Sequence, residues 1–373
     1  MARLGEICEI LDSKRVPITA TERQPGPYPY YGANGVQDYV ADYIFDDDLV
    51  LLAEDGGNFG SKDKPIAYRV SGKCWVNNHA HVLKPKEGLD VDYLCYSLMF
   101  YDVTGLVNGA TRQKLTQADM RKMEIPFLPL DEQRKIAAVL DKVSDLIAKR
   151  RQQLDKLDEM VKAHFVEMFG DCKTNPKNWS ICNLEDIAQV GSSKRVFVEE
   201  LKESGIPFFR GTEIGALAEG KKIEPELFIA EEHYQRLCQA TGKPQIGDLL
   251  MPSICPDGRI WIVNSEDPFY FKDGRVLWVH QINKDFNSIF LLYTLKDRIM
   301  TDYDSIASGT TFTELKIFSL KQCKIFNVPV QLQNQFAAFV EQTEKTKITI
   351  SRSLEKLETL KKKLMQDYFE WGK

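Results

Sequence analysis

Apolar residues recur at a helical spacing along one long stretch near the middle of the chain. Alternating steps of four and three residues from Ile136 reach Leu140, Val143, Ile147, Arg150, Leu154, Leu157, Val161, His164 and Met168. Eight of these ten positions are apolar, which is the pattern of a heptad seam on one helix. Neither Pro nor Gly occurs between Asp131 and Phe169. The pattern therefore predicts one unbroken helix of about 39 residues, roughly 58 Å long at about 1.5 Å per residue.

A second stretch, Gln331 to Phe369, repeats this frame. Its seam consists of Phe336, Val340, Ile350, Leu354, Leu357, Leu364 and Tyr368, and Thr343, Lys347 and Lys361 weaken it. The two stretches align at a constant offset of 200 residues and need no gap over some sixty residues. A repeat of this length indicates a duplicated architecture.

The segments that precede the two helices repeat more faintly and have a mixed α/β pattern. Residues 4–15 match residues 184–195, and Pro29-Tyr30-Tyr31 matches Pro207-Phe208-Phe209. We expect strands at 48–53, 66–70, 74–83, 248–251, 260–263 and 276–280, helices at 91–101 and 286–300, and an extra loop around 217–242. The predicted fold class is α+β, with two globular mixed α/β lobes and two long helices. The predicted domains are lobe 1 (1–108), a junction with the first helix (109–170), lobe 2 (171–308), and a junction with the second helix (309–373).

Composition and charge narrow the class of protein. A chain of 373 residues that is 43% apolar is long enough for two hydrophobic cores. The net charge is −6 for lobe 1 and −5 for lobe 2, against +2 and +4 for the two helical segments. A strongly basic surface is therefore excluded at the level of whole segments, and any DNA-binding face must be local or shared with a partner protein.

The cysteines and the apolar runs predict an intracellular location. The eight cysteines include no Cys-x-x-Cys pair, which favours buried reduced thiols of a cytosolic protein over a zinc site. The longest apolar runs, such as residues 288–295, are far shorter than the roughly 18 residues of a membrane helix. We expect a soluble cytoplasmic protein.

Several catalytic and metal interpretations are disfavoured. The pair His79-x-His81 has no Cys or carboxylate nearby at ligand spacing, so packing or loop hydrogen bonds are the better interpretation. Asp267-Pro268-Phe269-Tyr270 lacks the second proline of an amino-methyltransferase motif, and no Gly-rich cofactor loop precedes it. The run Asp46-Asp47-Asp48 has no lysine partner for a nuclease site. We therefore predict no catalytic residue and no metal site.

The junction segments resemble a known family. The sequence Gly109-Ala110-Thr111-Arg112-Gln113-Lys114-Leu115, the segment 125–130 and Glu132-Gln133-Arg134-Lys135-Ile136 are similar to the specificity (S) subunits of type I restriction-modification systems. The segment 78–83 and the order of lobes and helices are similar as well, and the resemblance covers essentially the whole chain. The second copy departs from the pattern, because residues 332–336 lack the Glu, and residues 309–313 lack the Arg and the Gln.

The resemblance implies a function and a set of partners. In that family each lobe is a target-recognition domain, the helices pair as an antiparallel coiled coil that relates the two copies by a pseudo-twofold axis, and the subunit itself has no catalytic activity. The implied partners are double-stranded DNA, two methyltransferase subunits and two ATP-dependent restriction subunits. The implied cofactors, S-adenosylmethionine and ATP with Mg, are used by those partners. The site would then have two specific halves and an unread gap.

Candidate DNA-contacting residues lie in the junctions and in the polar loops. We expect phosphate contacts, which position a protein without specifying sequence, from junction residues Thr111, Arg112, Gln113, Lys114, Thr310, Thr311 and Lys316, and from Lys14, Arg15, Lys194 and Arg195. Base reading is expected from Asn34, Gln37, Asn58 and Lys62 in lobe 1, and from Arg210, Thr212, Glu213, Ser253 and Arg259 in lobe 2. The alternative for the junctions is a solvated polar loop.

Apolar residues outside the seam predict a partner surface. Val139, Leu146, Met160 and Phe165 exceed what a two-helix seam buries, so we expect them to be exposed and to dock partner subunits. Two other function classes stay open at this point. The chain could be a methyltransferase with its own recognition domain, or a coiled-coil adaptor that does not bind DNA.

Overall fold

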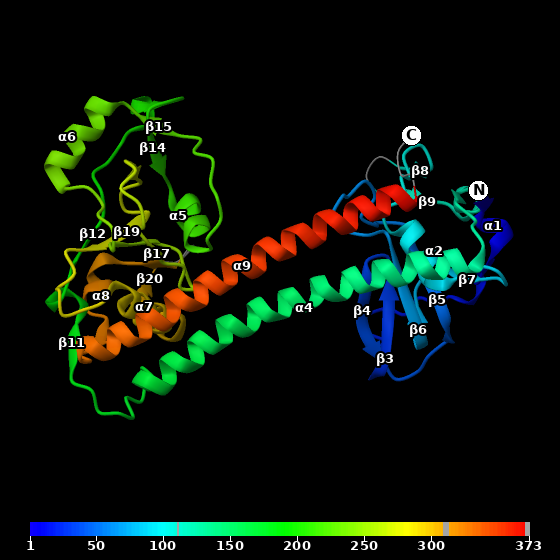
Figure 1. Cartoon of the computed structure of the whole chain (residues 1–373), viewed down its shortest axis with the longest axis horizontal. Helices are drawn as coiled ribbons and strands as arrows, with labels where there is room; N and C mark the ends of the chain where they lie inside the picture. The colour runs from blue at the N-terminus through cyan, green and yellow to red at the C-terminus, as the bar shows by residue number, and fades with distance from the viewer. Residues whose placement is uncertain (110–111, 309–312, 370–373) are drawn as a thin grey trace. The chain divides into compact units, whose positions relative to one another are not determined.

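The computed structural model describes residues 1–109, 112–308 and 313–369. It divides into two compact units, of which unit 1 comprises Met1–Gln153 and Ile350–Lys373, and unit 2 comprises Leu154–Thr349. Each unit contains one lobe together with parts of the two long helices, α4 (Leu130–Phe169) and α9 (Val330–Phe369) (Figure 1). The predicted α+β fold class, with two mixed α/β lobes and two long helices, is confirmed.

Both long helices are 40 residues long, as the uninterrupted heptad pattern predicts. None of the ten seam positions of α4 is exposed. In unit 2 the ring of His164 lies 4.3 Å from that of Phe339, while Asp158 pairs with Lys347. Residue numbers rise along one helix as they fall along the other, so the pairing is antiparallel. In unit 1 the helices are joined by an ion pair of 2.6 Å between Arg151 and Glu358.

Lobe 1 is built on a six-stranded mixed sheet. The strand order is β2 (Cys8–Ile10), β7 (Ala80–Pro85), β5 (Phe45–Ala53), β6 (Ala67–Val76), β3 (Pro25–Gly32) and β4 (Gly35–Val40). All neighbours are antiparallel except β3 and β6. Residues 49–53 of β5 are all buried, because Val50 and Leu52 face a core with helix α2 (Val91–Met99) while Leu49 and Leu51 face a second core. Burial on both faces explains the continuous apolar run of this strand.

One expected break in lobe 1 is wrong. Residues 66–70 and 74–83 were expected to form two strands separated near Gly72, whereas β6 runs without interruption from Ala67 to Val76. Gly72 has a φ of +76° and still pairs with Asp47 of β5. Glycine tolerates this backbone conformation inside a strand, so Gly72 does not form a turn between two strands here. The chain turns instead at residues 77–79.

Lobe 2 repeats the central strands of lobe 1. The strands β12 (Gln189–Gly191), β19 (Val276–His280), β16 (Leu249–Pro252) and β17 (Trp261–Ile262) form one sheet in the order that corresponds to β2, β7, β5 and β6. A second sheet has the order β13 (Leu201–Lys202), β15 (Phe228–Ile229), β14 (Ile206–Phe209) and β18 (Tyr270–Phe271). Strand β14 is parallel to β18, as β3 is parallel to β6.

The two lobes differ most at the edge of these sheets. In lobe 2 the place of β6 is divided between β17 and β18, and the residues between them include Pro268, which cannot donate a ladder hydrogen bond. Helix α7 (Ser288–Ile306) takes the place of α2. The segment expected as an extra loop carries the helix α6 (Glu231–Thr241), and α5 (Gly211–Ala218) precedes it.

The remaining elements of the described residues are short and lie outside these sheets. They are β1 (Ala2–Arg3), α1 (Leu4–Ile7), η1 (Asp12–Lys14), β8 (Val107–Asn108), β9 (Lys114–Leu115), α3 (Gln117–Met120), β10 (Glu124–Ile125), β11 (Ile181–Asn183), η2 (Leu184–Asp186), η3 (Val198–Glu200), β20 (Ala307–Ser308), β21 (Glu314–Leu315), α8 (Ile317–Lys321) and β22 (Lys324–Phe326). Strand β9 pairs with β8, and β21 pairs with β20, so both junctions contain the same short hairpin. Among the described residues, no helix is both long and apolar enough to cross a bilayer.

Candidate nucleic-acid interface

The junction of lobe 1 closes on the loop that follows β5. The amide of Leu115 donates to the carbonyl of Glu54 at 2.7 Å, and the amide of Gly56 donates to the carbonyl of Gln113 at 3.2 Å. Gly56 has a φ of +62°, and a Cβ atom at this position would lie 3.2 Å from Nε of Arg112. The positive φ favours a glycine where the loop meets the junction. These contacts bring predicted residues of the junction to the loop that contains Gly56.

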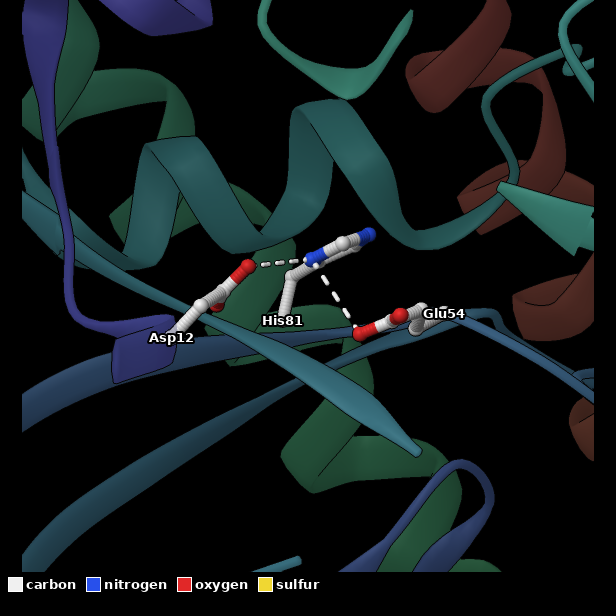
Figure 2. Close-up of side chains that lie close together, drawn as sticks. All are labelled: Asp12, Glu54 and His81. Carbon is white, nitrogen blue, oxygen red and sulfur yellow. Dashed lines mark hydrogen bonds and ion pairs between the residues drawn. The ribbon is translucent and has the colours of Figure 1, made fainter. Parts of the chain in front are cut away.

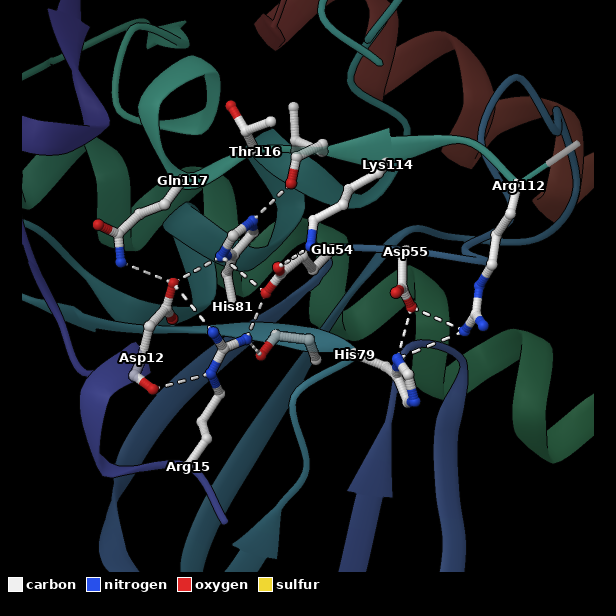
Figure 3. A network of polar contacts seen from close by, with 12 residues as sticks. Asp12, Arg15, Glu54, Asp55, His79, His81, Arg112, Lys114, Thr116 and Gln117 are labelled. Carbon is white, nitrogen blue, oxygen red and sulfur yellow. Dashed lines mark hydrogen bonds and ion pairs between the residues drawn. The ribbon is translucent and has the colours of Figure 1, made fainter. Parts of the chain in front are cut away.

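Beneath this contact lies a network of ion pairs (Figure 3). Glu54 is 9% exposed and pairs with Arg15 at 2.6 Å and with Lys114 at 2.9 Å. Arg15 also donates to the carbonyl oxygens of Ala80 at 2.7 Å and of Asp12 at 3.0 Å. The network joins η1, the end of β5, the start of β7 and the junction strand β9. It therefore ties the junction to lobe 1 through side chains as well as through the backbone.

Asp12 and His81 form the most deeply buried part of this network (Figure 2). Nδ1 of His81 lies 2.7 Å from Oδ2 of Asp12, and Nε2 lies 2.9 Å from the carbonyl oxygen of Leu115. Burial acts to raise the pKa of Asp12, but hydrogen bonds from His81, Gln117 and the Val82 amide hold that pKa below its ordinary value. Burial likewise acts against the charged form of Glu54, and its bonds from Arg15 and Lys114 lower its pKa.

Asp12, Glu54 and His81 are close enough together to be considered as metal ligands, because one atom from each lies within 4.8 Å of the others. Both ring nitrogens of His81 already contact an oxygen atom, one of Asp12 and one of Leu115, so neither is free to bind an ion. A metal ligand needs a free lone pair on nitrogen. Arg15 and Lys114 also already neutralise the two carboxylates. The geometry therefore fits an ion-pair network better than a metal site.

A second, more exposed cluster lies beside this network. Asp55 accepts from Arg112 at 2.8 Å, and its Oδ1 lies 2.6 Å from Nδ1 of His79. The Arg112 side chain is 59% exposed, whereas that of Asp55 is 18% exposed. Asn34 donates to the carbonyl of Gly56 at 3.0 Å on the same loop. The cluster presents an oriented guanidinium and an amide at the surface, which is the chemistry that contacts phosphates or base edges.

The other predicted residues of lobe 1 differ in exposure and in hydrogen-bond partners. Lys14 and Lys62 are exposed, and so are Gln37 and Gln113. Gln37 accepts from Asn77, and Asn58 donates to the carbonyl of Pro65. The Arg15 side chain is only 12% exposed, since it is engaged by the network above. Thr111 lies outside the described residues. The DNA contacts of all these residues stay predictions.

The junction of lobe 2 makes the same backbone contact with different side chains. The amide of Leu315 donates to the carbonyl of Ser253 at 2.7 Å, which matches the contact of Leu115 with Glu54. Ser253 is 2% exposed. Glu314 occupies the position of Lys114 in the hairpin of this junction, so a negative side chain replaces a positive one. Glu314 pairs with Arg275, and its carboxylate lies 3.4 Å from Nζ of Lys316. Thr310 and Thr311 lie outside the described residues.

Cations of lobe 2 are held by carboxylates. Arg210 pairs with Glu213 at 2.6 Å at the start of α5, and the pKa of Glu213 falls to about 2 because these hydrogen bonds outweigh its burial. Thr212 is exposed and also donates to Glu213. Arg259 lies over Gly215, where a Cβ atom would come within 2.9 Å of its Nη1. The structure therefore gathers Arg210, Thr212, Glu213 and Arg259 around α5.

Two further cations of lobe 2 match cations of lobe 1. Lys194 is exposed, and Arg195 pairs with Asp273 at 3.2 Å while its side chain stays 68% exposed. Arg195 therefore differs from its counterpart Arg15, whose side chain is buried in the ion-pair network. The lysines Lys14 and Lys194 are alike in being exposed.

Three of the four predicted partner-docking residues are exposed. Val139, Leu146 and Met160 are 41%, 39% and 43% exposed. The expectation that Phe165 is exposed is wrong, because it is 3% exposed and packs against Phe290 of α7. The heptad pattern accounts for burial by the other long helix, but it does not show that lobe 2 covers a second face of α4 here.

Three carboxylates of the site, Asp12, Glu54 and Asp55, are not among the predicted residues. Carboxylates separated by about 40 residues in the chain give no local spacing signal. Strand position was the one available signal, because Glu54 and Asp55 directly follow the apolar run of β5. The expectation that His79 and His81 make packing or loop hydrogen bonds agrees with their contacts to Asp55, Asp12 and Leu115.

Comparisons with known proteins agree with this duplicated architecture. The family model described as "Type I restriction modification DNA specificity domain" matches residues 1–158 and 176–361. The chain is 30% identical to a putative type I restriction enzyme specificity subunit of Haemophilus influenzae, over 94% of this chain and 89% of that one. It is 22% identical to the specificity subunit of the type I restriction enzyme MjaVIII of Methanocaldococcus jannaschii, over 98% of this chain and 90% of that one.

Solved structures share the fold. The crystal structure of the S subunit of a type I restriction-modification system from M. genitalium matches with a TM-score of 0.61 at 15% identity, over 98% of this chain and 95% of that one. A chain from a structural study of type I complex assembly matches with a TM-score of 0.56 at 16% identity, over 98% and 96%. With the family model matched over both halves and a relative of 30% identity over nearly its whole length, the chain belongs to the family of type I restriction-modification DNA specificity subunits.

Proposed function

We propose that this chain is a non-catalytic specificity subunit whose two lobes each read one half of a bipartite, gapped DNA site. The observation that carries the proposal is the duplication of one scaffold with two different edges. Both lobes have the same central strand order and the same junction hairpin. Beside this shared part, lobe 1 carries strand β4, which forms a hairpin with β3, and lobe 2 carries α5 and α6. Two copies of one scaffold that differ at the edge suit the reading of two different short sequences.

DNA contact in this proposal is local, because both lobes are acidic overall. Lys14 and Lys194 are exposed at equivalent positions and serve as phosphate contacts. Arg112 is oriented by Asp55 and adds a guanidinium at the first junction. Base reading falls to exposed polar groups near these cations, such as Asn34 in lobe 1 and Thr212 in lobe 2.

The chemistry in this proposal belongs to partner subunits. Two methyltransferase subunits use S-adenosylmethionine to methylate adenine in each half-site, and two restriction subunits use ATP with Mg to cleave unmodified DNA in the cytoplasm. This chain binds neither cofactor and selects the DNA sequence on which the partner subunits act. Exposed apolar residues on α4, namely Val139, Leu146 and Met160, support a docking surface for such partners.

The length of the gap is assigned to the two long helices. Each helix runs through parts of both units, so inserting residues into both helices changes the distance that separates the lobes. One whole heptad adds about 10.5 Å at about 1.5 Å per residue and keeps the seam in phase. That length corresponds to about three base pairs at roughly 3.4 Å each.

The experiment is methylome sequencing of a host that lacks other adenine methyltransferases and expresses this chain with its methyltransferase partner. We expect one methylated motif with two specific halves and a fixed gap, and we expect no such motif when the partner is expressed alone. Replacing Asn34 and Gln37 by Ala should change one half only, and a heptad inserted into both helices should lengthen the gap. An ungapped motif, or S-adenosylmethionine binding by the isolated chain, would contradict the proposal.

A further inference from the structure

One glutamine near the start of each long helix is completely buried. Gln133 of α4 and Gln333 of α9 are both 0% exposed, and they lie three residues after the first residue of their helices. A side-chain amide has two N–H donors and a carbonyl acceptor, and burial without partners is costly. The partners of these two helix-start glutamines therefore show what each residue holds together.

Gln133 joins α4 to lobe 1. Its Nε2 donates to the carbonyl oxygens of Gly88 at 2.9 Å and of Leu128 at 2.7 Å, and its Oε1 accepts from the amide of Asp90 at 2.9 Å. Gly88 and Asp90 belong to the lobe, in the loop between β7 and α2, whereas Leu128 belongs to the segment that enters α4. Both donors and the acceptor are used, so the amide connects three backbone segments at one point.

Gln333 repeats this arrangement in lobe 2. Its Nε2 donates to the carbonyl oxygens of Asp285 at 3.1 Å and of Val328 at 2.7 Å, and its Oε1 accepts from the amide of Asn287 at 2.8 Å. Asn287 caps α7 through its side chain, as Asp90 caps α2. Each helix-start glutamine therefore binds the capping residue of the lobe helix that packs beside it.

The side chains are kept at the helix starts but not around the junctions. Around the junctions the side chains diverge, since Glu54 and Lys114 of lobe 1 correspond to Ser253 and Glu314 of lobe 2. At the helix starts, by contrast, the residue type, its burial and its three kinds of partner are all kept. A constraint on the attachment of lobe to helix explains why this contact is the same in both copies.

We infer that Gln133 and Gln333 are positioning residues that fix the angle of each lobe on its own long helix and thereby restrict the gap between the two half-sites. The inference rests on the proposed function. A domain of about 100 residues has a radius of gyration of about 13 Å, so its reading face lies on the order of 20 Å from such an attachment point. A rotation of about 10° then moves that face by about 3.5 Å, which is close to the rise of one base pair.

The test uses the full chain with its methyltransferase partner and a DNA library in which the half-sites are fixed and the gap varies in single base pairs. Gln133→Met and Gln333→Met keep the length of the side chain and remove all three hydrogen bonds. We expect both variants to keep the half-site sequences, while the preference for the native gap over gaps one base pair longer or shorter falls at least tenfold. Gln133→Asn and Gln333→Asn keep an amide that is too short to reach both carbonyls, and they should relax the gap as well.

Matched controls remove a buried hydrogen bond inside a lobe. In Ser97→Ala the bond to the Leu94 carbonyl at 2.8 Å is lost, and in Thr294→Val the bond to the Phe290 carbonyl at 2.9 Å is lost. Controls that relax the gap equally would overturn the inference, and so would Gln→Met and Gln→Asn variants that methylate normally with an unchanged gap preference. Where a Met variant does not fold, the Asn variant of the same residue decides. Failure of the unmutated chain to direct methylation to any gapped site is a different result, because it rejects the proposed function itself.

Discussion

The substitution Glu54→Gln tests whether ion pairs hold the first junction against lobe 1. Glu54 accepts from Arg15 at 2.6 Å and from Lys114 at 2.9 Å. Glutamine keeps the size and one acceptor oxygen but removes the charge. Arg15 then keeps two backbone carbonyls and the Asp12 carboxylate at 3.6 Å. The loss in free energy of unfolding should therefore be substantial, but smaller than the full cost of leaving the buried Arg15 cation without a partner.

The size of this loss in stability depends on how exposed the paired side chains are. The side chains of Arg15 and Glu54 are 12% and 11% exposed, so this pair lies close to the buried limit, where removing one partner costs about 3–5 kcal/mol. The remaining partners of Arg15 reduce this to about 2–3 kcal/mol, in the range of a hydrogen bond to a charged group. The Lys114 side chain is 51% exposed, so its pair adds less than about 1 kcal/mol. We expect a total loss of about 3 kcal/mol.

Hydrogen exchange at neutral pH measures this loss locally, in peptides that cover β7 and the junction strand β9. A loss of about 3 kcal/mol lowers protection on the order of 100-fold, since about 1.4 kcal/mol corresponds to tenfold. Glu87→Gln, at an exposed position of the same lobe, is the matched control and should change protection little. Arg15→Met should cost about as much as Glu54→Gln, and the double variant should cost much less than the sum. A loss below about 1 kcal/mol, or a Lys114→Met variant that costs more than Arg15→Met, would refute this account.

Three other predictions concern pH, salt and partner binding. The folded-state pKa values of Asp12 and Glu54 lie below their ordinary values of 3.8 and 4.5. The stability that these two carboxylates contribute is therefore fully present above about pH 4.5 and is lost as the pH falls through the lowered pKa values. In urea titrations from pH 6 to pH 3, the free energy of unfolding should fall less for Glu54→Gln than for the unmutated chain. Lys14→Ala combined with Lys194→Ala should reduce the slope of log affinity for DNA against log salt by about 1.8, or about 0.9 for each lost phosphate contact, and an unchanged slope would exclude both lysines. Leu146→Asp should reduce co-purification of the methyltransferase partner at least tenfold while the exposed control Ala148→Asp does not, and equal recovery of both would remove Leu146 from the docking surface.

The long helices were predictable because their signal is local and long. A heptad seam without Pro or Gly leaves few alternatives over 40 residues, and both helices begin within one residue of the expected start. The central strands were also predictable, and β19 has the expected bounds of residues 276 and 280. Burial of Phe165 was not predictable from periodicity, since it depends on α7, more than 120 residues later in the chain.

The ion-pair network could not be predicted, for a different reason. Its members lie in or directly after η1, β5, β7 and β9, and only the folded sheet brings them together. The second copy does not repeat all residues of the network either. The register of the strands aligns His81 with Leu277, and the matching junction contacts align Glu54 with Ser253, so the second copy has neither a histidine nor a carboxylate at these places.

What the two copies do share indicates which contacts the duplicated scaffold requires. The amides of Leu115 and Leu315 bind the same backbone carbonyl at the end of the central strand, and Gln133 and Gln333 bind the same kinds of backbone group at the helix starts. All of these contacts end on the backbone, so they do not depend on the side chains of the lobe. A lobe can therefore change the residues around its junction, as the exchange of Lys114 for Glu314 illustrates, while its attachment to the helix is preserved. This separation allows the reading surface to diverge without changing where the lobe is attached to its helix.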